Sequence, residues 1–166
     1  MGALGTRAID AARRAGIAHT VHEYAHDARS SLREGGPGYA VEAVEALGID
    51  AARVFKTIVV SVDGRLGIAI VPADTEVDLK AVADALDGRR ASIAMPADAE
   101  KATGYVLGGI SPLGTRRPLP TLLDASASRY ATIHVSAGRR GLEIELAPAD
   151  LLVLTKGLMA QVARRS

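Results

Sequence analysis

The chain has 166 residues, with no cysteine, no tryptophan and one phenylalanine. This length predicts a single domain over residues 1–166, and an aromatic content of 3% requires an aliphatic core. The absence of cysteine excludes a disulfide framework, thiolate-bound zinc, iron–sulfur clusters and a cysteine nucleophile. No apolar run has the length of a membrane span and the N-terminus lacks an apolar signal core, so we expect a cytoplasmic protein.

The net charge of +1 conceals an uneven distribution along the chain. Residues 101–166 carry nine basic and four acidic side chains, including the pairs Arg116–Arg117, Arg139–Arg140 and Arg164–Arg165. Such asymmetry is typical of a surface that faces a polyanion. An ordinary solvated surface explains the same composition and is slightly favoured on composition alone.

The first predicted elements are a helix between an N-cap at Thr6 and a stop at Gly16, then a strand over His19–Tyr24. Residues 25–38 have loop composition. The elements expected after them are helix 39–47, strands 54–62 and 66–71 joined by Asp63-Gly64, helix 77–86, strand 91–94 and helix 96–102.

Residues 104–120 are rich in glycine and proline and predict a long loop, a feature that is usually functional or disordered. Beyond it we expect strands at 122–123, 131–136 and 142–146, a helix from Pro148 to about Leu154, and a helical C-terminus. Hairpins and helices mix without regular βαβ alternation. The pattern therefore favours an α+β domain with a mixed, barrel-like sheet.

The sequence from His22 to His26 matches the metalloprotease string HExxH. That motif requires a helix, which brings both histidines to one face. Here it begins in a predicted strand, where residues four apart lie about 13 Å from each other. We interpret the match as chance, expect surface histidines, and assign no metal ligands.

Lys56 shares an alternation face with four aliphatic residues of the strand 54–62. A lysine on a core-facing row is costly unless it is paired or lines a cavity. The alternative is a lysine near the strand start whose ammonium reaches solvent. The pattern leaves these two interpretations about equal.

Gly108 and Gly109 lie in the most unusual stretch, residues 103–114. Paired glycines allow close approach to a ligand and expose amides that bind a phosphate or an oxyanion, so we expect both to contact substrate. The alternative is a structural turn; Arg116 and Arg117 just after it favour anion contact. Ser136 lies in a second Gly/Ser/Arg turn, and no serine–histidine pair can be placed around it.

Three segments together resemble the YbaK/EbsC family of aminoacyl-tRNA deacylases, relatives of the editing domain of bacterial prolyl-tRNA synthetases. The segments are Val54-Phe55-Lys56-Thr57; Thr103-Gly104-Tyr105 running into Gly108-Gly109-Ile110-Ser111-Pro112-Leu113-Gly114; and Ile133-His134-Val135-Ser136 into Arg140-Gly141-Leu142. The resemblance extends from about residue 8 to residue 165. It implies a mixed, barrel-like sheet flanked by helices and hydrolysis of mischarged aminoacyl-tRNA, with Cys-tRNA(Pro) as the leading substrate.

The resemblance also implies the site residues. Lys56 matches the functional lysine, Tyr24 a pocket tyrosine, Gly108 a glycine whose backbone contacts substrate and Ser136 a pocket serine, while Tyr39 stands where the family more often has phenylalanine. We expect tRNA contacts from the two arginine pairs Arg116–Arg117 and Arg139–Arg140.

The resemblance implies no cofactor and no metal. An aminoacyl ester is already activated, so a strong protein nucleophile is dispensable, and in the YbaK branch the thiol of a bound cysteine is expected to assist. The expected partners are mischarged tRNA and prolyl-tRNA synthetase, with no membrane. Deacylation of Ala-, Ser- or Thr-tRNA and a non-catalytic module that binds tRNA or a synthetase remain as alternatives.

Overall fold

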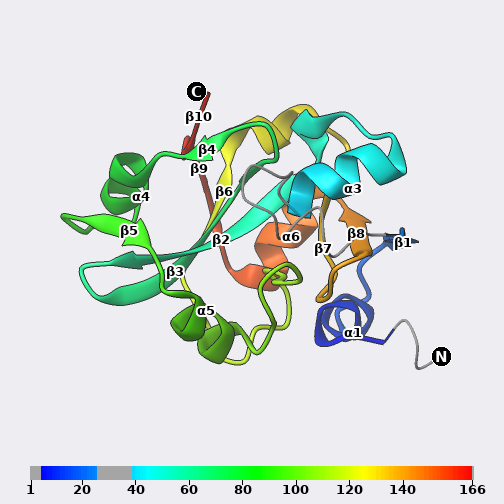
Figure 1. The fold of residues 1–166 in the computed structure, drawn as a ribbon, viewed down its shortest axis with the longest axis horizontal. Helices are drawn as coiled ribbons and strands as arrows, with labels where there is room; N and C mark the ends of the chain where they lie inside the picture. Colours follow the sequence, from blue (N-terminus) through cyan, green and yellow to red (C-terminus); the bar gives the residue numbers. More distant parts are fainter. Residues whose placement is uncertain (1–4, 26–38, 166) are drawn as a thin grey trace.

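The computed structural model describes residues 5–25 and 39–165, whose strands form two main sheets and one short pair (Figure 1). The five-stranded sheet has the order β5-β2-β3-β6-β9 and is mixed, because β2 is antiparallel to β3 and β5 whereas β3, β6 and β9 run parallel. The three-stranded sheet β1-β8-β7 is antiparallel. The strands are β1 (His19–Glu23), β2 (Phe55–Val62), β3 (Arg65–Pro72), β4 (Glu76–Val77), β5 (Ala91–Ile93), β6 (Thr121–Asp124), β7 (Ile133–Ser136), β8 (Leu142–Leu146), β9 (Leu158–Ala160) and β10 (Ala163–Arg164).

A single parallel bridge between Val54 and His134 links the start of β2 to β7, so the small sheet continues the large one. The helices α1 (Arg7–Arg14), α3 (Tyr39–Leu47), α4 (Leu79–Ala85), α5 (Pro96–Thr103) and α6 (Pro148–Thr155) surround these sheets. This arrangement confirms the predicted mixed α+β architecture.

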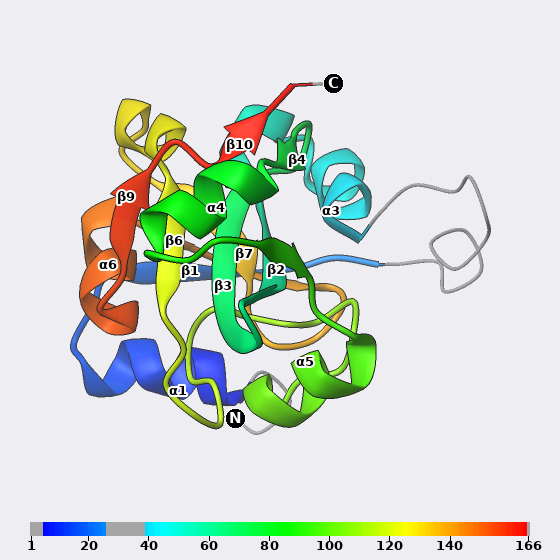
Figure 2. The same cartoon turned by 90° about the vertical axis from the view of Figure 1, so that its left-hand side faces the viewer.

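Aliphatic side chains bury both faces of the large sheet. The larger core cluster joins α1, α5 and α6 to strands of both sheets, and contains Ile9, Phe55, Leu123 and Leu151. On the opposite face, α4 packs across β3 and β6 (Figure 2). A third, small cluster lies beneath α3. Through this cluster, α3 packs against Val54, just before β2, and Tyr24, just after β1.

The local signals of the sequence explain most of these elements. The Thr6 hydroxyl accepts a hydrogen bond from the Ile9 amide at the start of α1, as predicted. Asp63 and Gly64 both have positive φ in the predicted two-residue turn of the β2–β3 hairpin. The predicted helix over 77–86 begins two residues late, because Val77 pairs in β4 and Asp78 caps α4.

The helical C-terminus was a wrong prediction. Residues 158–160 form β9, which lies parallel to β6, and residues 163–164 form β10, which pairs with β4. Within residues 5–25 and 39–165, no helix combines the length and apolar character needed to cross a membrane.

Candidate functional site

A cavity of about 290 Å³ opens between α3, the start of β2, the ends of β1 and β7, and the loop after α5. Most of its wall is apolar. It brings together four of the predicted site residues, which are Tyr24, Lys56, Gly108 and Ser136. The other lining residues are Ala40, Val41, Phe55, Thr57, Ile58, Ala73, Leu107, Ile110 and Glu143.

Lys56 is the second residue of β2, and its half-buried side chain lines this cavity. Burial lowers the pKa of its ammonium, an effect that the nearby carboxylates of Glu76 and Asp74 oppose. The structure therefore favours a lysine that lines a cavity over one that only reaches solvent. Such an ammonium can hold a phosphate or polarise a carbonyl oxygen.

Glu143 is a pocket residue that the sequence reasoning missed. Its side chain is buried, and its Oε1 atom has no hydrogen-bond partner among the described residues. Burial raises the pKa of the Glu143 carboxyl to about 8. The alternation Leu-Glu-Ile-Glu-Leu in β8 was the available signal, because it puts two glutamates on the face opposite the core.

Thr57 was also missed, although it directly follows Lys56 in the cavity wall. Its Oγ1 atom is buried and has no hydrogen-bond partner within the described part of the chain. Buried polar atoms in folded proteins almost always have partners. Two such atoms, on Thr57 and Glu143, in the wall of one cavity indicate that a polar ligand completes the site.

Tyr24 and Ser136 flank Glu143 in the small sheet. The Tyr24 amide donates to the Gly141 carbonyl at 2.9 Å, which extends the β1–β8 pairing by one residue. Burial, followed by the Glu143 charge, raises the pKa of the Tyr24 phenol to about 12. Ser136 is the register partner of Glu143, and its Oγ accepts a hydrogen bond from the Gly138 amide.

The two glycines of the loop have different roles. Gly108 has a φ of 93° and lines the cavity, at the third position of a turn closed by the Gly109 amide and the Val106 carbonyl at 2.9 Å. Gly109 does not line the cavity. A Cβ atom there would lie 2.5 Å from the Arg139 Cα, so this glycine permits close packing against the β7–β8 turn. Its amide is already used in the turn.

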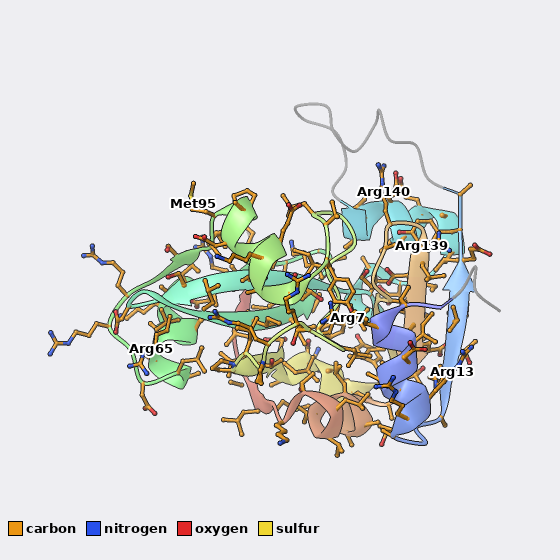
Figure 3. All side chains as sticks on the ribbon, turned by 90° about the horizontal axis from the view of Figure 1, so that it is seen from below. Arg7, Arg13, Arg65, Met95, Arg139 and Arg140 are labelled. Atoms are coloured by element: carbon orange, nitrogen blue, oxygen red, sulfur yellow. The ribbon has the colours of Figure 1, made fainter. Side chains whose placement is uncertain are left out.

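None of the predicted tRNA-contact arginines lines the cavity. Arg116 and Arg117 are exposed just beyond the glycine loop, and Arg139 is exposed beside Glu23 at 3.5 Å. Arg140 differs, because its guanidinium donates to both carboxylate oxygens of Glu42 in α3, at 2.9 and 2.8 Å. Figure 3 labels Arg139 and Arg140 beside α3. The structure thus gives Arg140 a role in holding α3 over the pocket.

Two remaining predictions fall at the edge of the described residues. Tyr39 begins α3, directly before the lining residues Ala40 and Val41, but its side chain lies outside the described part. His22 lies in strand β1, so the HExxH string has no helix to form a zinc-protease motif. His26, the second histidine of that string, lies outside the described residues.

A larger hollow of about 690 Å³, lined in part by Arg129, Arg164 and Arg165, contains none of the predicted site residues. The smaller cavity combines one amine, one carboxyl, a buried hydroxyl and a glycine backbone with an apolar wall, and no histidine is among the described residues that line it.

The chain matches the aminoacyl-tRNA editing domain family over residues 37–154. It is 41% identical over 128 residues to EbsC of Enterococcus faecalis, a candidate Cys-tRNA(Pro)/Cys-tRNA(Cys) deacylase, and this alignment covers 76% of the chain and 77% of the relative. It is 31% identical over 115 residues to the proline–tRNA ligase of Acidithiobacillus ferrooxidans, covering 69% of the chain and 20% of the ligase. A crystal structure of a candidate trans-editing enzyme for prolyl-tRNA synthetase has the same fold, with a TM-score of 0.80 and 24% identity over 95% of both chains.

Proposed function

Because the chain belongs to the aminoacyl-tRNA editing domain family, we propose that it hydrolyses the ester bond of mischarged aminoacyl-tRNA, with Cys-tRNA(Pro) as the leading substrate. The observation that carries the proposal is the cavity itself. Its volume of about 290 Å³ suits an aminoacyl group rather than a folded nucleic acid. The Thr57 Oγ1 and the Glu143 Oε1, which have no hydrogen-bond partner among the described residues, are available to the polar groups that such a ligand brings.

Each pocket residue has a distinct role in this proposal. The Lys56 ammonium binds the terminal adenosine phosphate or stabilises the negative charge that develops on the ester carbonyl oxygen. The backbone at Gly108 lies against the same carbonyl. The Glu143 carboxyl accepts a hydrogen bond from the substrate amino group, and the hydroxyls of Thr57 and Ser136 position the ester. Water is the final acceptor of the acyl group.

The tRNA body lies outside the cavity in this proposal. The exposed arginines Arg116, Arg117 and Arg139 are the candidates for its phosphates, since Arg140 is engaged by Glu42. Prolyl-tRNA synthetase is the proposed protein partner. The similarity to one-fifth of a proline–tRNA ligase supports it, because there a domain of this kind is part of the synthetase chain.

The test is deacylation of purified Cys-tRNA(Pro), compared with Ala-, Ser-, Thr- and Pro-tRNA. We expect Cys-tRNA(Pro) to be hydrolysed fastest. We expect Lys56→Ala to lower kcat/KM on the order of 100-fold, the effect typical of losing one group that stabilises an oxyanion. Thr57→Val keeps the side-chain shape and removes only the hydroxyl, and should cost about tenfold. Lys80→Ala, at an exposed position of α4, is the matched control and should retain full activity.

Three outcomes contradict the proposal in separate ways. Hydrolysis no faster than the buffer blank, together with measurable tRNA binding, would make the protein a non-catalytic module. Full activity in Lys56→Ala would refute the assigned mechanism. Faster hydrolysis of Ala-, Ser- or Thr-tRNA would change the substrate. The same assay with added prolyl-tRNA synthetase tests the partner, and an unchanged rate would argue against it.

A further inference from the structure

A second cluster of reactive side chains lies on the small sheet, outside the cavity. It consists of His22 in β1, Glu145 in β8 and His134 in β7, one residue from each strand. The alternation of β8 turns Leu142, Ile144 and Leu146 toward the core, so Glu145 faces the other way. None of these three residues lines the cavity of the candidate site.

The three side chains converge on a small volume. One ligand atom of each lies within 4.8 Å of those of the other two. The His22 Nε2 lies 2.8 Å from the Glu145 Oε1, and the His134 Nε2 lies 4.0 Å from the same oxygen. Ligand atoms around a tetrahedral zinc ion are about 3.3 Å apart, given bonds of about 2.0 Å. Small side-chain rotations therefore bring this cluster to metal-binding geometry.

His134 supplies an independent observation. Its side chain is only 3% exposed, and its Nδ1 has no hydrogen-bond partner among the described residues. The 4.0 Å separation of its Nε2 from Glu145 is beyond hydrogen-bond distance. No hydrogen bond therefore joins the His134 Nε2 to Glu145, and this nitrogen can bind a metal ion at the cluster. Nδ1, the other ring nitrogen, would keep no partner among the described residues.

The other oxygen of Glu145 is already fixed in place. The Thr132 hydroxyl donates to Oε2 at 2.5 Å, and the Arg53 guanidinium lies 3.5 Å from the same atom. Outer contacts of this kind orient a ligating carboxylate, and they leave Oε1 directed at the histidines. The positive charge of Arg53 weakens the binding of any cation. Two imidazoles and one carboxylate favour ions such as Zn²⁺ over Mg²⁺ or Ca²⁺.

We propose that His22, His134 and Glu145 form a binding site for one divalent transition-metal ion of the Zn²⁺ type. The ion would connect all three strands of the small sheet, with its fourth position open to water, since His22 and Glu145 remain 30% and 24% exposed. Ser136 and Glu143 extend from the same two strands as His134 and Glu145. The proposal stands independently of the deacylase function.

The experiment titrates the chelator-treated, full-length protein with Co²⁺, follows the visible absorption of the bound ion, and then displaces it with Zn²⁺. We expect saturation at one equivalent and a higher Tm with Zn²⁺ than without. His22→Ala changes a strand residue whose side chain is partly exposed, and this variant should fold. It should weaken Co²⁺ binding at least about tenfold, because it removes one of three ligands. Glu145→Gln should act in the same direction.

Two control variants make the result specific to this cluster. His19→Ala removes another histidine of β1, whose Nδ1 lies 2.7 Å from the Ile17 carbonyl oxygen, and should bind Co²⁺ as the unchanged protein does. His26→Ala tests the HExxH string and should also leave binding unchanged. Absence of saturable binding would overturn the proposal. So would equal binding by His22→Ala, or a loss caused by His26→Ala.

Discussion

The ion pair between Arg140 and Glu42 should make a large contribution to the stability of the pocket. It is bidentate, and the two side chains are only 15% and 10% exposed. Removing one partner of a buried pair costs about 3–5 kcal/mol, because the remaining charge stays buried and loses its ion pair. Residual exposure of the guanidinium places Arg140→Met at the lower end, near 3 kcal/mol. At about 2–4 °C per kcal/mol for a chain of this size, Tm should fall by roughly 6–12 °C.

Urea denaturation of four proteins tests the expected loss of about 3 kcal/mol. The four proteins are the unchanged chain, Arg140→Met, Glu42→Gln and the double variant. The double variant should be more stable than the sum of the single effects predicts, with a coupling free energy of about 2 kcal/mol. Arg139→Met is the matched neighbour control. Its guanidinium lies 3.5 Å from Glu23 and is 47% exposed, so its loss should cost under about 1 kcal/mol.

The functional consequence follows from the position of α3. Ala40 and Val41 of this helix line the cavity, so loosening α3 should raise KM for aminoacyl-tRNA more than it lowers kcat. Equal denaturation midpoints for Arg140→Met and Arg139→Met would refute the reasoning. Strict additivity in the double variant would refute it as well, because the pair would then carry no coupling.

Three further results are expected. Because burial lowers the pKa of Lys56, the enzyme-dependent deacylation rate should fall as pH rises through a value below the ordinary 10.5. Lys56→Arg stays charged over this range and should not show the decline. Identical pH profiles for the two proteins would count against a role for the charged amine. Gly109→Ala should lower both stability and activity, because its Cβ would meet the Arg139 backbone, whereas Val106→Ala, at a 72% exposed position of the same loop, should change neither. Thr6→Ala should lower the free energy of unfolding in urea by about 1–2 kcal/mol, because it removes the N-cap of α1. Thr6→Ser keeps a capping hydroxyl and should retain most of this stability. Equal denaturation midpoints for the two variants would show that the cap does not stabilise α1.

Short-range signals predicted the elements well wherever the stabilising contact is local. The Asp63-Gly64 turn needs only its own backbone conformation, and the Thr6 cap needs only the next turn of chain. The C-terminal segment failed because residues 158–160 become a strand through parallel pairing with β6, more than thirty residues earlier. A local pattern cannot show that partner, and tertiary pairing overrides helix propensity there.

The candidate site also contains both kinds of residue, those that a local sequence signal predicts and those that only the tertiary structure identifies. Lys56 had a local anomaly, a cation on an aliphatic row, and it lines the cavity. Glu143 had only a weak signal, the alternation that puts it on the face of β8 opposite the core, and Thr57 had none, since a threonine in a β-branched run is ordinary. Their significance comes from burial without hydrogen-bond partners among the described residues, in the wall of a cavity that residues of α3 and the glycine loop also line. Only the folded chain contains that information.

The turn between β7 and β8 contacts two walls of the pocket, the glycine loop and α3, without lining the pocket itself. On one side, the backbone of Arg139 packs where only a glycine fits, at Gly109 of the glycine loop. On the other side, the next residue, Arg140, is held by Glu42 of α3. A displacement of this turn would therefore move the loop and α3 together. The contacts of both residues are thus explained by assembly of the pocket, and Arg139, whose side chain is the more exposed of the two, is the better candidate for the proposed contact with tRNA.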